Sequence, residues 1–289
     1  MTATILVLIL ASAVMHPIRE FIVKGDQTPS GVMLAVVIQF FLLAGAQTWF
    51  KGDDPWIAFE VWPSMLASGL SILFYYWCIL MTLRTGDLSI YYPIIRSSPL
   101  FVVTVGLLFL GHTFSSMMLS GIALVLVGSF LLQYQPGGDL FNQPKTLALA
   151  ILALCAHGLA TLADAESMKV AEPSSYLFVQ YIFMIPGMIL VSIMTIPRGH
   201  SLYKQLFSGW SRTPGRFIFA GVMSYASYYL ILWVFQLGGG AASVSSIRLI
   251  SIPLSVILGC VFFKKARIGA RLAWSLLITI GIAVIIYSK

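Results

Sequence analysis

Charge is scarce in this chain. Asp, Glu, Lys and Arg make up 9% of its 289 residues, whereas hydrophobic residues make up 59%. A soluble domain carries about 25% charged residues, so water cannot be the solvent for most of this protein's surface. Acidic residues are the scarcer sign, with 10 Asp and Glu against 17 Lys and Arg and a net charge of +7. In a membrane protein an excess of basic residues is explained by their enrichment in cytoplasmic loops. The positive charge is therefore not taken as a sign of a nucleic-acid partner.

Cysteines and catalytic motifs are also scarce. The three cysteines, Cys78, Cys155 and Cys260, are far apart and form no C-x-x-C or Cys/His pattern. This spacing predicts no disulfide, metal site or cofactor, and we interpret the cysteines as small core residues. The sequence also has no Walker motif, and no G-x-S-x-G elbow, H-E-x-x-H or paired-carboxylate motif organises the Ser, His and Asp residues of the predicted helices. Direct use of ATP and an enzymatic activity are therefore not expected.

Long apolar runs recur along the whole chain, and each is long enough to cross a hydrocarbon core of about 30 Å. The first run, 2–23, lacks the basic start and cleavage site of a signal peptide and is interpreted as a retained helix. The sequence therefore predicts an all-α integral membrane protein with ten transmembrane helices. Their expected ranges are 2–24, 31–50, 62–83, 88–110, 115–134, 146–169, 174–196, 217–237, 241–263 and 267–287. The longest connection, 197–216, is polar and basic.

An internal repeat relates the two halves of the chain. The matched pairs, 154 residues apart, are Tyr75 with Tyr229, Gly86 with Gly240, Ser89 with Ser243 and Pro99 with Pro253. Two consecutive copies of a five-helix unit must enter the membrane from opposite sides, which gives an inverted repeat. We therefore expect a first repeat over 1–140 and a second over 141–289, with the substrate site at the interface between them.

The basic residues are distributed unevenly between the two sides of the predicted bundle. Eleven lie in alternate connections, at Lys24, Arg84, Lys145, Arg198, Lys204, Arg212, Arg216, Lys264, Lys265, Arg267 and Arg271. The opposite side holds Lys51, Lys169 and Lys289. Because cytoplasmic loops carry the excess of Lys and Arg, both termini are predicted to face away from the cytoplasm.

The segment Gly86 to Tyr134 resembles the EamA repeat of the drug/metabolite transporter superfamily. It has Gly-x-x-Ser at a helix start, Pro within the helix, an apolar run, a short polar break and a glycine-containing helix. Residues 240–287 resemble the same repeat. Met-His-Pro at 15–17, followed by Lys24, is similar to the His-plus-Lys pattern of many bacterial members, and residues 156–169 are a looser match. The resemblance covers the whole chain.

Two positions depart from the family pattern: His112 stands where a glutamate is often found, and Lys264 and Lys265 occupy the corresponding region of the second half. The resemblance implies a ten-helix metabolite transporter with a central cavity lined by helices 1, 3, 4, 6, 8 and 9. Members move sugars, amino acids, phosphorylated metabolites and cations, so the resemblance leaves the substrate open.

Arg96 and Arg248 are the strongest candidate site residues. Each lies about nine residues into a predicted helix, near the bilayer centre, and charges there are costly enough to mark functional sites. They occupy nearly equivalent positions of the two repeats. A guanidinium is a planar fork that matches a carboxylate or phosphate, so the pair predicts an anionic ligand. The alternative is pairing with Asp164, Glu166 or helix-end carbonyls.

Tyrosines extend the candidate substrate site. Tyr92 shares one face of its predicted helix with Arg96 and Pro99, and this face is expected to line a cavity. Tyr75 and Tyr229 recur well inside their helices, where a phenol can hydrogen-bond a polar ligand. Pro99 and Pro253 each remove a helical hydrogen bond and are expected to kink their helices. Aromatic belts at the membrane interface are the alternative role for the tyrosines.

Further ionisable residues lie in the first and sixth predicted helices. His16 and Arg19 are expected to extend the substrate site, and His157 and Asp164 to couple protons, because histidine titrates near neutrality. The alternative is local ion pairing, such as Glu166 with Lys169.

These observations favour a secondary active transporter that moves a small anionic metabolite by alternating access. An organic phosphate, phosphonate or carboxylate fits two arginines. The alternatives are a carrier of a phosphate-bearing lipid or lipid-linked intermediate, and an exporter of amino acids or other neutral metabolites. The expected setting is a bacterial-type inner membrane, where the chain contacts lipid and exists as a monomer or homodimer.

Overall fold

The computed structural model describes residues 2–23, 29–85, 88–133, 143–196, 199–212, 214–255 and 268–288, and these contain helices and connections but no strand. The elements before residue 140 are α1 (Ala3–Val23), α2 (Pro29–Lys51), the 3₁₀-helix η1 (Pro55–Val61), α3 (Trp62–Thr85), α4 (Leu88–Ile95), α5 (Ser98–Leu108) and α6 (Ser116–Gln133). Those after it are α7 (Pro144–Ser167), α8 (Pro173–Thr195), α9 (Leu202–Arg212), α10 (Pro214–Gln236), α11 (Ala241–Ile247), η2 (Arg248–Ile250) and α13 (Ile268–Tyr287).

The helices are of membrane-spanning character. Six described segments are long and apolar enough to cross a bilayer: 30–51, 55–85, 91–108, 144–167, 173–195 and 214–236. Four shorter apolar helices cover 3–15, 116–132, 241–255 and 273–287. The fold is therefore all-helical and multi-pass over the described residues, as the apolar runs predict.

Proline sets the start of several helices. The first residues of α2, α7, α8 and α10 are Pro29, Pro144, Pro173 and Pro214. Proline suits this position because the first helical N–H has no partner within the helix, and its fixed φ is already helical. The observed starts lie within three residues of those expected from the hydropathy pattern.

Two predicted helices are interrupted in the structure. The helix expected over 88–110 is divided at Arg96 and Ser97, where Ser97 N bonds Ile94 O at 2.9 Å and Ser97 Oγ donates to Pro93 O at 2.7 Å. Pro99 has no N–H to offer to the carbonyl one turn back, so the α-helical ladder stops there. In the second half α11 gives way to η2 at Arg248, five residues before Pro253.

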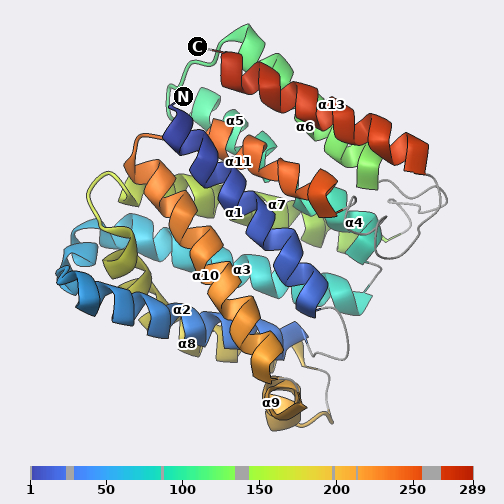
Figure 1. The fold of residues 1–289 in the computed structure, drawn as a ribbon. Helices are drawn as coiled ribbons and strands as arrows, with labels where there is room; N and C mark the ends of the chain where they lie inside the picture. The colour runs from blue at the N-terminus through green and yellow to red at the C-terminus, as the bar shows by residue number, and fades with distance from the viewer. Residues whose placement is uncertain are drawn as a thin grey trace.

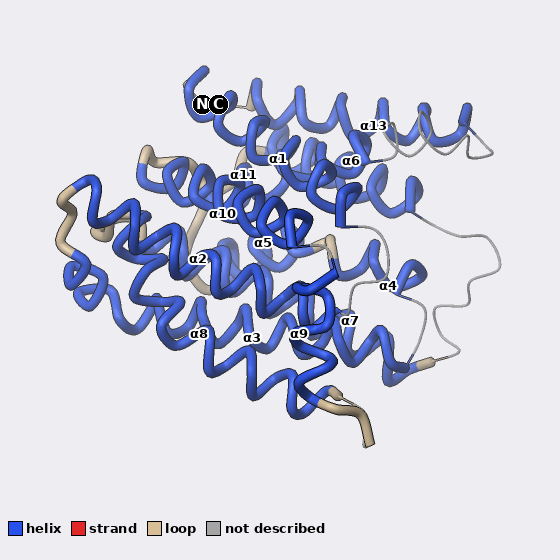
Figure 2. Tube along the Cα trace, turned by 60° about the horizontal axis from the view of Figure 1, so that its bottom comes forward, coloured by secondary structure: helices blue, strands red, loops and turns tan. Residues whose placement is uncertain are grey.

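Helices from the two halves pair closely. The principal pairs are α3 with α7, α6 with α13, α1 with α10, α2 with α8 and α2 with α10. Each pair joins an element before residue 140 to one after residue 143. Figures 1 and 2 show the helices packed side by side, with α6 and α13 together at one edge of the bundle.

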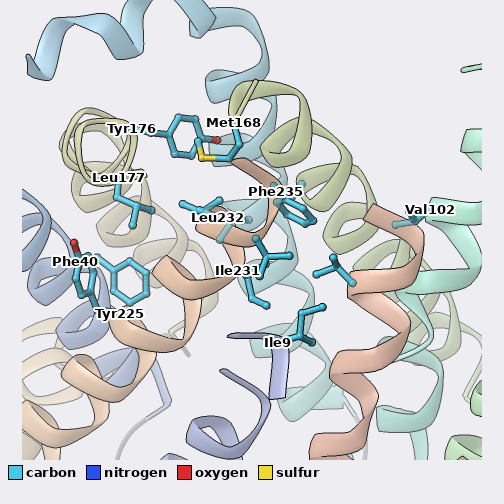
Figure 3. Close-up of a cluster of buried hydrophobic side chains, with 14 of the residues drawn as sticks. Ile9, Phe40, Val102, Met168, Tyr176, Leu177, Tyr225, Ile231, Leu232 and Phe235 are labelled. Carbon is cyan, nitrogen blue, oxygen red and sulfur yellow. The ribbon is translucent and has the colours of Figure 1, made fainter. Parts of the chain in front are cut away.

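The apolar core runs through the centre of this bundle. Ile231 and Leu232 of α10 and Leu177 of α8 are at most 2% exposed, and Ile9 of α1 is fully buried. Figure 3 shows these side chains gathered between the helices. The core therefore joins helices from both halves.

The connection 197–216 is polar and basic, as the sequence predicts. Its described residues also contain the eleven-residue helix α9, which the sequence analysis does not predict. The helix α9 is too short and too polar to span a membrane, so a search for long apolar runs does not find it. The apolar residues at 202, 206 and 210 nevertheless repeat at helical spacing.

Gly281 permits the closest backbone approach between α6 and α13. A Cβ at Gly281 would lie 2.8 Å from the carbonyl oxygen of Gly121 and 2.9 Å from the backbone nitrogen of Val125. We expect Gly281→Ala to reduce the free energy of unfolding by about 1–3 kcal/mol, because these backbone atoms cannot rotate away. Thermal unfolding in detergent measures this loss.

Gly215 provides the matched control, since a Cβ there meets nothing within 4 Å. Gly215→Ala should keep the wild-type unfolding temperature or raise it slightly, because alanine favours helix. Equal unfolding temperatures for both variants would show that the close approach of α6 to α13 is not tight enough to exclude a methyl group.

Candidate substrate-binding site

A small cavity lies where the interrupted helices meet α1, α3, α7 and α10. Its lining includes Tyr75, Arg96, Ser98, His157, Arg248 and Ser251. The volume is about 50 Å³, which holds a few water molecules at roughly 10–15 Å³ each.

Arg96 reaches the cavity from the interruption between α4 and α5. Its Nη2 donates a hydrogen bond to Ser251 Oγ at 2.9 Å, which joins the fourth predicted helix to the ninth. Its guanidinium carbon lies 5.7 Å from the centre of the Tyr92 ring, a cation–π distance. Arg96 is thus held by groups from both halves of the chain.

Arg248 reaches the same cavity from the interruption between α11 and η2. It is half-buried, and its guanidinium makes no hydrogen bond or ion pair with any residue that the structure describes. Arg96 adds a nearby like charge, and Asp164 an opposite one. A partly desolvated cation beside a second cation is an unfavourable arrangement that a bound anion would relieve.

Tyr75 and His157 form another wall of the cavity. Their ring centres are 5.2 Å apart, and His157 Nδ1 lies 2.9 Å from Ser98 Oγ. Ser98 begins α5, so the histidine contacts the helix interruption that carries Arg96. The wall therefore combines an aromatic face with hydroxyl and imidazole groups, which can accept or donate hydrogen bonds.

Asp164 lies next to the cavity, within the protein. It is 2% exposed, and Oδ1 accepts hydrogen bonds from Ser68 Oγ at 2.5 Å and from Tyr176 Oη at 2.8 Å. Tyr228 Oη donates to the other carboxylate oxygen, Oδ2. The three donors come from α3, α8 and α10, so the Asp164 network connects both halves through α7.

The remaining predicted site residues fall elsewhere. Tyr92 contacts Arg96 without lining the cavity. Tyr229 also does not line it, and its ring packs 6.0 Å from that of Tyr225. His16 and Arg19 belong to α1, but their side chains lie outside the described residues; Ser12, one turn earlier, lines the cavity.

Several polar residues at the site have no signal in the sequence. The hydroxyl groups around Asp164, from Ser68, Tyr176 and Tyr228, lie on three other helices, so only the packing brings them together. Ser251 is likewise an ordinary serine until Arg96 is placed against it. Of the predicted alternatives, the Glu166–Lys169 ion pair is present, at 2.5 Å.

The described residues include no group of three or more His, Cys, Asp or Glu side chains able to hold a metal. Cys78 is buried and Cys155 half-buried, both with free thiols. The groups in and beside the cavity are guanidinium, hydroxyl, phenol, imidazole and carboxylate.

Comparisons with known proteins agree with this architecture. No curated protein matches the sequence. A solved structure described only as "Crystal structure of protein" superposes with a TM-score of 0.78 at 14% identity, covering 98% of this chain and 96% of its own. At this identity the similarity shows the fold alone. Residues 1–134 match the model of the EamA-like transporter family.

The family match covers the helices that carry Tyr75 and Arg96 and confirms, over residues 1–134, the resemblance predicted from the sequence. The matched family is one of transporters, and six described segments of this chain are long and apolar enough to span a membrane. The chain is a multi-pass membrane protein whose residues 1–134 match the model of the EamA-like transporter family.

Proposed function

We propose that this protein is a secondary transporter that moves a small anionic metabolite, such as an organic phosphate, phosphonate or carboxylate, across a bacterial-type inner membrane. Ten transmembrane helices form two inverted repeats, 1–140 and 141–289. The single observation that carries the anion assignment is the placement of Arg96 and Arg248 in one cavity, with no protein partner for the Arg248 guanidinium among the described residues.

The two helix interruptions support this proposal. Discontinuous helices surround the central sites of many transporters, because their free backbone ends and polar side chains face the ligand. Arg96 and Arg248 each sit at such an interruption, and Ser98 at the start of α5 lines the same cavity. A helix start carries a partial positive charge, which adds to the attraction for an anion.

Alternating access fits the pairing of helices across the two halves. Arg96 and Ser251 come from different halves, as do Asp164 and Ser68. A rocking motion of one half against the other would change these contacts while the arginines keep hold of the ligand. In this scheme Tyr75 orients the substrate, and His157 and Asp164 carry the coupled proton.

A ligand screen tests the anion assignment directly. Purified protein is heated with anions, amino acids, sugars and cations, alongside the double variant Arg96→Gln/Arg248→Gln. We expect an organic phosphate, phosphonate or carboxylate to raise the wild-type unfolding temperature and to have no effect on the double variant. Stabilisation by a neutral or cationic compound, retained in the double variant, would reject an anionic substrate.

A further inference from the structure

The short helix α9 lies across the end of the bundle. It follows α8, which ends at Thr195, and precedes α10, which begins at Pro214; both neighbours are long and apolar enough to span a membrane. Figure 1 shows α9 nearly end-on at the base of α10, whereas α10 runs along the bundle. The helix therefore lies where α8 ends and α10 begins, and it runs across the bundle rather than along it.

One face of α9 is packed against the protein. Leu206 is 3% exposed, and the Trp210 ring lies 5.7 Å from that of Phe217 in α10. The helix also contacts α2 and α8. These contacts fix its orientation, so the remaining face is presented outward.

The outward face combines aromatic and basic side chains. Tyr203 is 73% exposed and Phe207 is 38% exposed, and their ring centres are 5.3 Å apart. Lys204, in the same helix, is exposed, and Arg216 is exposed at the start of α10. Aromatic rings of this kind prefer the boundary between acyl chains and headgroups, and basic side chains reach the phosphates above it.

All charged residues in the segment that contains α9 are basic. Residues 197–216 contain Arg198, Lys204, Arg212, Arg216 and His200, and no Asp or Glu. A basic amphipathic helix at a membrane surface is complementary to anionic lipid, since the attraction of its cations adds to burial of its apolar residues. Neutral headgroups offer no such complementarity.

We propose that α9 is an in-plane helix that binds the headgroups of anionic phospholipids. Tyr203 and Phe207 enter the headgroup boundary, and Lys204 and Arg216 pair with lipid phosphates. The surface is separate from the central cavity, so the proposal does not rest on the identity of the transported substrate. Because α9 connects α8 to α10, bound lipid restrains the two helices that it joins.

Hydrogen–deuterium exchange of the full-length protein in nanodiscs tests this proposal. The discs contain phosphatidylcholine with increasing fractions of phosphatidylglycerol, and the amides of 202–212 are followed. We expect phosphatidylglycerol to slow their exchange several-fold. A basic side chain near an anionic surface contributes about fivefold in affinity, so Lys204→Gln or Arg216→Gln should require about fivefold more anionic lipid for the same protection.

Lys145→Gln is the matched control, because Lys145 is an exposed lysine outside α9, at the start of α7. This variant should keep the wild-type lipid dependence. Equal protection in neutral and anionic discs would overturn the proposal, as would an unchanged lipid dependence in Lys204→Gln/Arg216→Gln. A loss of the same size in Lys145→Gln would also overturn it, by assigning the effect to overall charge.

Discussion

Arg248→Gln is expected to weaken binding of the transported anion by about ten- to a hundredfold. A hydrogen bond to a charged group contributes about 1.5–3 kcal/mol, and each 1.4 kcal/mol corresponds to about tenfold in affinity. The Arg248 guanidinium has no partner among the described residues, so its hydrogen-bonding capacity is available to a ligand. Calorimetric titration with the anion found in the ligand screen measures the loss.

The same substitution should leave the fold intact. No described hydrogen bond or ion pair is lost, and the substitution removes both the repulsion from Arg96 and the attraction to Asp164, so the unfolding temperature should stay close to that of the wild type. Arg248→Lys should bind with intermediate affinity, since it keeps the charge but loses the planar fork. This separation of binding from stability distinguishes a ligand-binding arginine from a structural one.

Arg84→Gln controls for the loss of an arginine outside the cavity. Arg84 is exposed at the end of α3, where Nη1 donates to Thr195 O at 2.7 Å. The variant should bind the anion as the wild type does. If Arg248→Gln instead bound the anion normally and unfolded at a lower temperature than Arg84→Gln, Arg248 would be a structural residue.

The cavity arginines were predictable because their cost in a membrane is visible in the sequence. Arg96 and Arg248 stand alone near the centres of long apolar runs, and the structure brings both into one cavity with Tyr75 and His157. Charge and depth sufficed to choose these two residues. The ligand itself does not follow from them, so the anion assignment is a proposal.

Tyr229 shows where the repeat is a poor guide. It matches Tyr75 in sequence, yet Tyr75 lines the cavity and Tyr229 does not. The preceding residue, Tyr228, donates to Asp164 instead. One residue rotates a helical position by about 100°, so matching positions in two repeats need not face the same neighbours.

Helix extent was predictable from hydropathy, whereas interruptions and short surface helices were not. The apolar run over 88–110 continues through Arg96, and the break depends on Pro99 together with the Ser97 and Pro93 contacts. The helix α9 is too short and polar for a search by hydropathy. Its spacing of apolar residues was informative, but its position across the bundle depends on packing against α2, α8 and α10.

Asp164→Ala is expected to lower the free energy of unfolding by at least about 3 kcal/mol. Ser68, Tyr176 and Tyr228 would lose their common acceptor, and a buried donor left unpaired costs about 1–3 kcal/mol. Tyr176 and Ser68 are fully buried, so water cannot readily replace the carboxylate. Unfolding followed by circular dichroism in detergent measures the loss.

Glu166→Ala is the matched control, because Glu166 lies in the same helix, α7, two residues after Asp164. Glu166 is exposed and pairs with Lys169 at 2.5 Å. An exposed pair contributes at most about 1 kcal/mol, so this variant should be nearly as stable as the wild type. Equal losses in the two variants would contradict a structural role for the hydroxyl network around Asp164.

Asp164→Asn separates this structural role from proton coupling. An amide of the same size keeps one carbonyl oxygen that accepts from two hydroxyl groups, and its NH2 can donate to the third hydroxyl oxygen, so the variant should fold. It cannot carry a proton or a negative charge. The substitution also removes the negative charge of Asp164 from near Arg248. It should tighten anion binding at least severalfold, because the carboxylate no longer repels the anion or competes with it for Arg248.

Uptake into proteoliposomes with an imposed pH gradient completes the test. The wild type should accumulate the anion faster with the gradient than without it, whereas Asp164→Asn should bind the anion yet show no response to the gradient. A full response in Asp164→Asn would remove Asp164 from proton coupling. His157→Gln should then be the variant that loses it, because His157 is the titratable cavity residue beside the Arg96 interruption.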